Sequence, residues 1–251
     1  ALAQTPLSLP APSPGASVTQ TIGTTDFSLK YSRPGVKGRA IWGGLVPWEQ
    51  PWRTGANAAT MLTCSDDVRV EGRALPAGSY AIVTIPGKEQ WTVAFSKQKS
   101  IWQGTTYDSK EDQLRVSVKP QAAENVEWLQ FTFDVAAANE TDLALRWEKL
   151  RVPVRIAVDV NAKVVKDCRG AVAAAAADDW RTPYRAANWC FDNGQALDDA
   201  AAWGAKALQT KENFQTLSLA AKMAAKAGRT KEAVAQMTRA VALGKADKDL
   251  V

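Results

Sequence analysis

The chain has 251 residues, contains no histidine and carries a formal net charge of +5. The absence of histidine excludes a Ser-His-Asp or Cys-His catalytic arrangement and every zinc site that includes a histidine. The charge excess is small and the basic residues form no long stripe, so we expect no nucleic-acid binding. No apolar run approaches the roughly 18 residues that a membrane helix needs, so we also expect no membrane span.

The first residues are typical of an exported protein. Ala1-Leu2-Ala3 fits the small-residue end of a secretory signal peptide, although the sequence could also simply begin there. Residues 4–17 are rich in Pro, Ser and Ala, a composition typical of an extended tail. We therefore predict a periplasmic or secreted protein in which residues 1–17 are a signal-peptide remnant and a flexible tail.

The segment from Tyr31 to Thr60 combines tryptophans, arginines and glycines, and Glu49 is its only acidic residue. Its glycines and prolines exclude a regular helix or a long strand. Arginines bind carboxylates and phosphates through two parallel hydrogen bonds, and tryptophan faces stack on sugars or cations. With a second aromatic wall from residues 102–107, the candidate ligand-binding residues are Arg33, Arg39, Trp42, Trp48, Trp52, Arg53, Asn57, Trp102 and Tyr107.

The same residues have a second interpretation as packing groups. Tryptophan in a large β-domain is more often part of the core than a ligand platform. In this interpretation Trp42 and Trp52 close the open end of the fold, and Arg53 forms an ion pair with Asp108 or Glu148. We favour the packing role, and the clustering of glycine and arginine in one loop keeps the binding role open.

From residue 18 to residue 160 the apolar residues recur mostly at every second position. Turn sequences such as Pro76-Ala77-Gly78 and Pro86-Gly87 separate these runs. About nine or ten short strands with one apolar face predict an antiparallel β-sandwich over residues 18–160. The clearest alternating runs lie at 27–31, 91–95, 114–118, 129–133, 143–147 and 152–160.

Several blocks within this range occur in a characteristic order: YSRP, KGR, WGGLVP, WRTGAN, LPAGSY and TIPG. Together they resemble the bacterial family called domain of unknown function 2911, over about residues 17–160. The family pattern has an acidic residue where this chain has Ala58, and usually tyrosine in place of Trp48. The resemblance implies a β-rich exported domain and supplies no established activity.

After Val160 the pattern changes to long, alanine-rich helical segments. A repeat of about 34 residues relates the segments around Gly194 and Gly228, each with a helix, a glycine-containing turn and a second helix. The period resembles the tetratricopeptide repeat, and two plain helical hairpins are the alternative. We predict that residues 161–251 form a tetratricopeptide-like helical domain that binds a protein or peptide partner, or a second copy of the chain.

The three cysteines are expected to have structural roles. In an oxidising compartment a disulfide between Cys168 and Cys190 would contribute about 3 kcal/mol in the chain-entropy model. Cys64 lies in an alternating run and is expected to be a small buried apolar residue. No Cys-x-x-Cys pair or EF-hand spacing is present, so we expect no metal and no cofactor.

The predicted fold class is therefore mainly β plus α: an antiparallel β-sandwich followed by a short helical-repeat domain. The predicted function is an exported binding module for a small molecule, a glycan or a peptide, with a helical protein-interaction domain. The alternatives are a hydrolase that uses paired carboxylates and a purely structural scaffold. A non-enzymatic role is favoured because no pair of acidic residues stands out.

Overall fold

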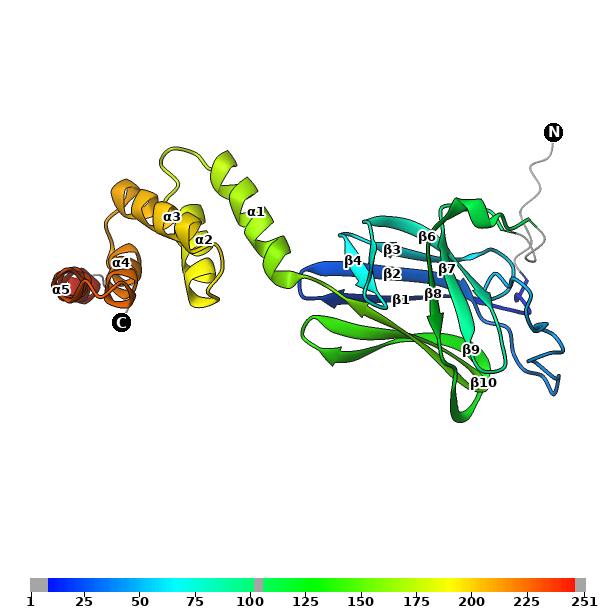
Figure 1. Ribbon diagram of the computed structural model, residues 1–251. Coiled ribbons are helices and arrows are strands. Elements are labelled where there is room, and N and C mark those ends of the chain that lie inside the picture. The colour runs from blue at the N-terminus through cyan, green and yellow to red at the C-terminus, as the bar shows by residue number, and fades with distance from the viewer. Residues whose placement is uncertain (1–8, 102–105, 247–251) are drawn as a thin grey trace, which may run out of the picture. The chain divides into compact units, whose positions relative to one another are not determined.

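A computed structural model describes residues 9–101 and 106–246 of the chain (Figure 1). The chain divides into two compact units, Ala1–Val160 and Asn161–Val251. The first unit contains two antiparallel sheets packed together, and the second contains packed helices. This confirms the predicted fold class. None of the described helices is long and apolar enough to cross a membrane.

The larger sheet has six strands, and its apolar face follows from the alternating sequence. In its second strand, for example, Phe27 and Leu29 are buried whereas Asp26 is exposed. The first strand begins at Gly15, so residues 15–17, which we expected to be part of the flexible tail, belong to an edge strand. In spatial order the strands are β1 (Gly15–Ile22), β2 (Thr25–Ser32), β3 (Thr60–Cys64), β6 (Gly78–Ile85), β7 (Trp91–Ser96) and β8 (Asp112–Val118).

The smaller sheet is built around a strand that turns back on itself. Strand β10 has a positive φ of 52° at Glu148, and beyond this point it returns alongside its own first half (Figure 1). Val158 N donates to Asn139 O at 2.9 Å, and Arg155 Nε lies 2.9 Å from Asp142 Oδ1. The strands, in spatial order, are β5 (Arg73–Leu75), β4 (Val68–Val70), β10 (Glu140–Ala157) and β9 (Gln121–Ala137).

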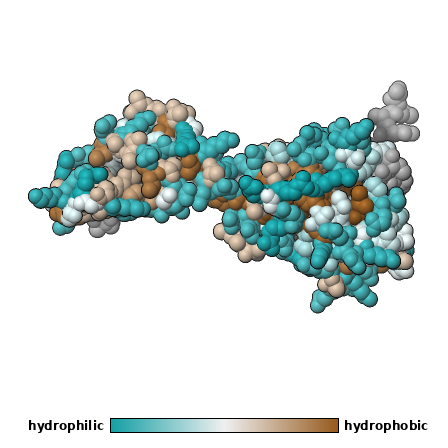
Figure 2. Space-filling model, viewed as in Figure 1, coloured by the Kyte–Doolittle hydropathy of each residue, from teal (hydrophilic) through white to brown (hydrophobic). Residues whose placement is uncertain are grey.

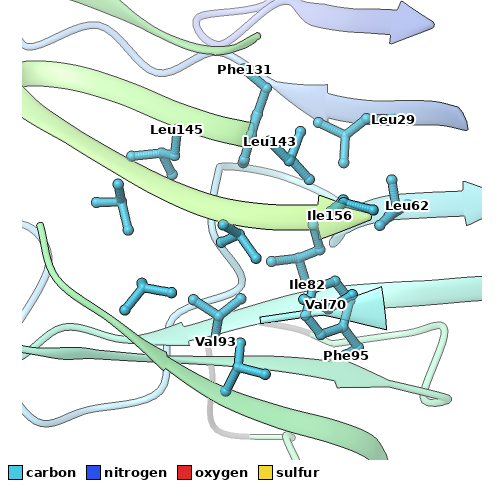
Figure 3. Packing of buried hydrophobic residues seen from close by; sticks show 14 of the residues in the cluster. Leu29, Leu62, Val70, Ile82, Val93, Phe95, Phe131, Leu143, Leu145 and Ile156 are labelled. Carbon is cyan, nitrogen blue, oxygen red and sulfur yellow. The ribbon is translucent and has the colours of Figure 1, made fainter. Parts of the chain in front are cut away.

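The core lies between the two sheets. Leu62, Ile82 and Phe95 extend from the larger sheet toward Phe131 and Leu143 of the smaller one (Figure 3). All five are at most 5% exposed. Complete burial of such a side chain contributes about 1.5–3 kcal/mol, so this interdigitated layer is the main source of stability of the first unit.

The second unit consists, within the described residues, of five helices. The second and fourth helices each end at a glycine with positive φ, Gly194 at 64° and Gly228 at 76°, which is the usual helix-ending conformation. Asn213 and Thr216 form a reciprocal capping box at the start of the fourth helix. The helices are α1 (Val160–Ala174), α2 (Arg181–Asp192), α3 (Leu197–Thr210), α4 (Phe214–Lys226) and α5 (Thr230–Ala246).

Candidate functional site

The loop between β2 and β3 contains most of the candidate residues, and its first part is attached to the smaller sheet. Gly35 forms an isolated antiparallel bridge with Trp128 of β9, and Leu129 N donates to Pro34 O at 3.0 Å. Arg33 Nε donates to Leu129 O at 3.0 Å. Arg33 therefore connects the loop to the backbone of β9.

The last part of the loop is attached to the larger sheet. Trp52 and Thr84 exchange two backbone hydrogen bonds of 2.8 and 2.9 Å. Thr54 Oγ1 donates to Thr84 Oγ1 at 3.1 Å, and Thr60 Oγ1 donates to Thr54 O at 2.7 Å. The loop therefore spans the open end of the sandwich and is fixed to both sheets.

The backbone of this loop is strained at several positions. Lys37, Glu49, Thr54 and Asn57 have positive φ values of 50°, 58°, 57° and 56°. This region is unfavourable for residues other than glycine, and most of all for β-branched residues such as threonine. Strained positions persist only where the surroundings enforce them, and they concentrate at binding sites and active sites. Among the described residues other than glycine, four of the seven with positive φ lie in this loop, which makes it a candidate site.

Two tryptophans of the loop, Trp42 and Trp52, pack against two from the strands, Trp91 and Trp147. The Trp42 ring lies 5.0 Å from Trp91, 6.0 Å from Trp52 and 5.8 Å from Trp147, edge to face in each case. Trp52 stacks on Trp147 at 5.8 Å, and Trp91 and Trp147 are 0% and 1% exposed. These rings fill the end of the core, which is the arrangement expected from the packing interpretation.

Next to these tryptophans, residues of the loop line most of a partly open pocket of about 410 Å³. Three of the nine candidate residues, Arg39, Trp52 and Arg53, line it. The remaining lining is mainly apolar, with one hydroxyl group from the N-terminal segment. It consists of Ser13, Pro34, Leu45, Val46, Pro47, Pro51, Gly55, Ala56 and Trp147.

Both arginines of the pocket are anchored to loop carbonyl groups. Arg39 donates through Nε to Val36 O at 3.1 Å and through Nη2 to Gly35 O at 2.5 Å. Arg53 donates through Nε to Asn57 O at 2.9 Å. Burial lowers the pKa of Arg53, which means that its charge is partly removed from water. The pocket thus combines two oriented cations with an apolar wall.

Residues 13–156 match the family described as protein of unknown function DUF2911. The chain belongs to this family. The matched range includes every residue that lines the pocket, so the pocket is part of the DUF2911 domain. Neither a curated protein nor a solved structure matches the chain.

Other candidate residues of the DUF2911 domain support the loop rather than line the pocket. Asn57 Nδ2 donates to Ser13 O at 3.0 Å and ties the loop to the N-terminal segment. Trp48 is half-buried against Gly43, where an added methyl group would lie 2.4 Å from Trp48 Nε1.

The packing interpretation gave Arg53 a carboxylate partner in Asp108 or Glu148. These carboxylates accept hydrogen bonds from the backbone N–H groups of Lys110 and Lys149.

Tyr107 belongs to a different cluster, on the outer face of the six-stranded sheet. Its hydroxyl group donates to Asp112 Oδ2, and Arg115 Nε donates to the same oxygen at 2.5 Å. Burial, together with the hydrogen bond to Asp112, raises the pKa of Tyr107 to about 12. Tyr107 therefore does not form the expected second wall of the loop pocket, and Trp102 lies outside the described residues.

Sequence reasoning missed several residues of the pocket. Trp147 comes from β10 and Ser13 from the segment before β1, both far from the loop in sequence. The alternation of Leu143, Leu145 and Trp147 predicts that Trp147 faces inward. It does not indicate which end of the sandwich Trp147 reaches.

The described residues contain no carboxylate pair in the pocket and no group of three potential metal ligands.

The predicted disulfide is absent from the structure, in which Cys64, Cys168 and Cys190 are all free thiols. Cys190 is buried and Cys168 is half-buried, and each thiol influences the pKa of the other. They are therefore neighbours, and their oxidation to a disulfide stays a prediction.

Proposed function

We propose that the DUF2911 domain of this protein is a binding module whose ligand occupies the loop pocket. The observation that carries the proposal is the convergence of Arg39, Arg53 and Trp52 on one pocket beneath a strained loop. The volume of the pocket, about 410 Å³, falls in the usual range of small-molecule sites, about 300–1,000 Å³. This size favours a small molecule, or the end of a glycan or peptide, over an extended polymer.

The test is a ligand screen that is sensitive to occupation of this pocket. Full-length protein would be screened against a fragment library, with the indole N–H signal of Trp52 in NMR spectra as the readout. Ala56→Phe should fill the pocket and remove binding. Ala74→Phe, at an exposed position of β5, is the matched control and should retain it. Binding that survives Ala56→Phe would place the ligand elsewhere and refute the proposal.

A second role, in protein binding, is supported by the last helix. Val234, Met237 and Val241 of α5 are 61%, 38% and 43% exposed and share one helix face by their spacing. Apolar residues are also visible among the hydrophilic ones over the helices in Figure 2. An exposed apolar stripe of this kind is typical of a surface that another protein covers.

The internal repeat indicates what kind of group fits this stripe. Counted from the first residues of α3 and α5, Met237 corresponds to Gly204. Gly204 is buried by α4, and an added methyl group there would lie 3.2 Å from Met223 Sδ. The face of α3 that packs against α4 therefore corresponds to an exposed face of α5. This correspondence favours a helix, from a partner protein or from a second copy of the chain, as the group that covers the stripe.

Sedimentation analysis of the variants Met237→Glu and Thr238→Glu would test whether a second copy of the chain binds to the α5 stripe. Both positions are exposed on α5, and only Met237 belongs to the apolar stripe. If the wild type forms an oligomer that is lost in Met237→Glu and kept in Thr238→Glu, binding of a second copy is supported. A protein that is monomeric at all concentrations would exclude a second copy as the occupant.

A further inference from the structure

We infer that the ligand of the loop pocket is an organic anion, with a carboxylate or phosphate group attached to an apolar body. This inference rests on the proposed binding function and adds the chemical class of the ligand. Its first support is the charge of the lining. Arg39 and Arg53 are the charged residues among the described residues that line the pocket, and both are cations. A ligand that enters this pocket therefore meets two positive charges.

Glu49, Glu127 and Glu148 are not among the residues that line the pocket. Glu127 Oε1 accepts a hydrogen bond from Lys37 N at 2.9 Å, and Glu148 Oε2 accepts one from Lys149 N at 2.7 Å. Glu49 extends toward Gly87, where an added methyl group would lie 3.0 Å from Glu49 Oε1. Glu127 therefore supports the backbone of the loop and Glu148 that of its own turn, and the charged residues among the described lining are the two arginines.

The guanidinium groups are also held in place before any ligand arrives. The hydrogen bonds of Arg39 to Val36 O and Gly35 O use two of its five N–H groups. The bond from Arg53 Nε to Asn57 O fixes the plane of the second guanidinium group. Because the rotamers are already restricted, binding an anion costs less side-chain entropy than it would with two mobile arginines.

The partial burial of Arg53 also favours the binding of an anion. The pKa of Arg53 is lowered by desolvation, so its cation is less stable in the pocket than in water. An anion beside it would offset part of this cost, and a hydrogen bond between two charged groups is stronger where water is excluded. A neutral ligand would offset less of it, because it brings no opposite charge.

The rest of the lining specifies the other end of the ligand. Leu45, Pro47, Pro51 and Trp52 give an apolar wall next to the arginines, and Leu45 is 46% exposed. Inorganic phosphate or sulfate would leave this wall uncovered. An apolar chain or ring attached to the anionic group would cover it and gain about 25 cal/mol for each Å² of apolar surface removed from water.

The test uses four probes with a common apolar body: 4-phenylbutyrate, 4-phenylbutyramide, 4-phenylbutylamine and 3-phenylpropyl phosphate. Binding to full-length protein would be measured by NMR titration of the Trp52 indole signal. We expect one or both anions to bind at least about 10-fold more tightly than the amide, a difference of about 1.4 kcal/mol, and the amine not to bind. Comparing the carboxylate with the phosphate identifies the preferred anionic group.

Variants assign the effect to the arginines. Arg39→Gln should weaken binding of the anions about 10-fold and leave the amide unchanged, and Arg39→Lys should restore part of the loss. Arg69→Gln, at an exposed arginine of β4 outside the pocket, should bind like the wild type. Equal affinity for the amide and the acid would refute the anion inference but leave the pocket as a binding site. Failure of all four probes and of the fragment library would refute both.

Discussion

Arg53 Nε and the carbonyl oxygen of Asn57 are joined by a hydrogen bond of 2.9 Å across a tight turn of the loop. Asn57 in turn donates from its side chain to Ser13 O. The two residues thus form a continuous connection from the pocket to the N-terminal segment. Arg53 therefore stabilises the loop through a backbone carbonyl group and also lines the pocket.

Replacing Arg53 by alanine should lower the free energy of unfolding by about 1.5–3 kcal/mol, the range for a hydrogen bond that involves a charged group. Urea denaturation of the full-length protein measures this change. Lys119→Ala, at an exposed position, should change the free energy by no more than about 0.5 kcal/mol. If Arg53→Ala is as stable as this control, Arg53 has no structural role.

Replacing Trp147 by alanine should be among the most destabilising changes in the domain. Its side chain is 1% exposed and contacts Trp42 and Trp52, so the substitution leaves a cavity that costs about 3–5 kcal/mol. Chemical denaturation would measure the loss. Trp128→Ala, at a tryptophan that is 37% exposed, should cost less than half as much. Similar losses for the two variants would argue against a shared tryptophan core at this end.

Tyr107 should ionise only at high pH. Its pKa is raised to about 12 by burial and by the hydrogen bond to Asp112, so a spectrophotometric titration should contain a late step that Tyr107→Phe removes. Because the pKa is higher in the folded than in the unfolded state, the associated stability is complete below about pH 10. It is lost as the pH rises toward 12. A titration that is unchanged in Tyr107→Phe would contradict this assignment.

Asp134 should contribute to stability above acidic pH. Burial raises its pKa, but hydrogen bonds from Arg151, Thr132 and Arg146 outweigh this effect and lower it. The stability is present above the unfolded pKa and is lost as the pH falls through the folded value. Asp134→Asn should therefore destabilise the protein at pH 7 by about 0.5–1.5 kcal/mol, more than a typical exposed pair. The difference from wild type should shrink in denaturation measurements at decreasing pH.

The control for Asp134 is Glu140→Gln. Glu140 forms a single ion pair with Arg155, at 3.2 Å, and its side chain is 37% exposed. Its replacement should change stability by at most about 1 kcal/mol. A pH dependence that is the same for Asp134→Asn and wild type would show that the arginines do not act through this carboxylate.

Oxidation should join Cys168 to Cys190. After purification under oxidising conditions, labelling of the unfolded and unreduced protein should detect one free thiol, at Cys64. Reduction should then lower the stability of the helical unit by about 2–4 kcal/mol and leave the sandwich unchanged. Three free thiols under these conditions would end the prediction.

Much of the sandwich could be predicted because each inward-facing residue alternates with an outward-facing one. Leu143, Leu145 and Trp147 illustrate this, since they are buried as their spacing requires. Strand β1 (GASVTQTI) was missed because its inner positions include the polar Gln20 and the small Ala16, which weakens the alternation. The turn within β10 was missed because Glu148 adopts a positive φ without a glycine or a turn sequence to mark it.

The candidate site could be predicted only as a segment. The composition of the loop indicated Arg39, Trp52 and Arg53 correctly as neighbours of one another, because they are close in sequence. Trp147 and Ser13 reach the pocket through the pairing of strands, and no local pattern contains that information. Tyr107 was assigned to the loop pocket only because it is aromatic. Its hydrogen-bond partners, Asp112 and Arg115, lie with it on the outer face of the six-stranded sheet.

The turn at Glu148 also bears on how the chain folds. Because β10 returns beside itself and pairs with β9, the centre of the smaller sheet is made from one continuous stretch, residues 121–158. Contacts between residues that are close in sequence cost little loop-closure entropy and form early, whereas β2 and β3 can pair only after the long loop between them has closed. Pulse-labelled amide exchange should therefore detect protection in β9 and β10 before β3, so the scaffold beneath the pocket is ordered before the loop that completes it.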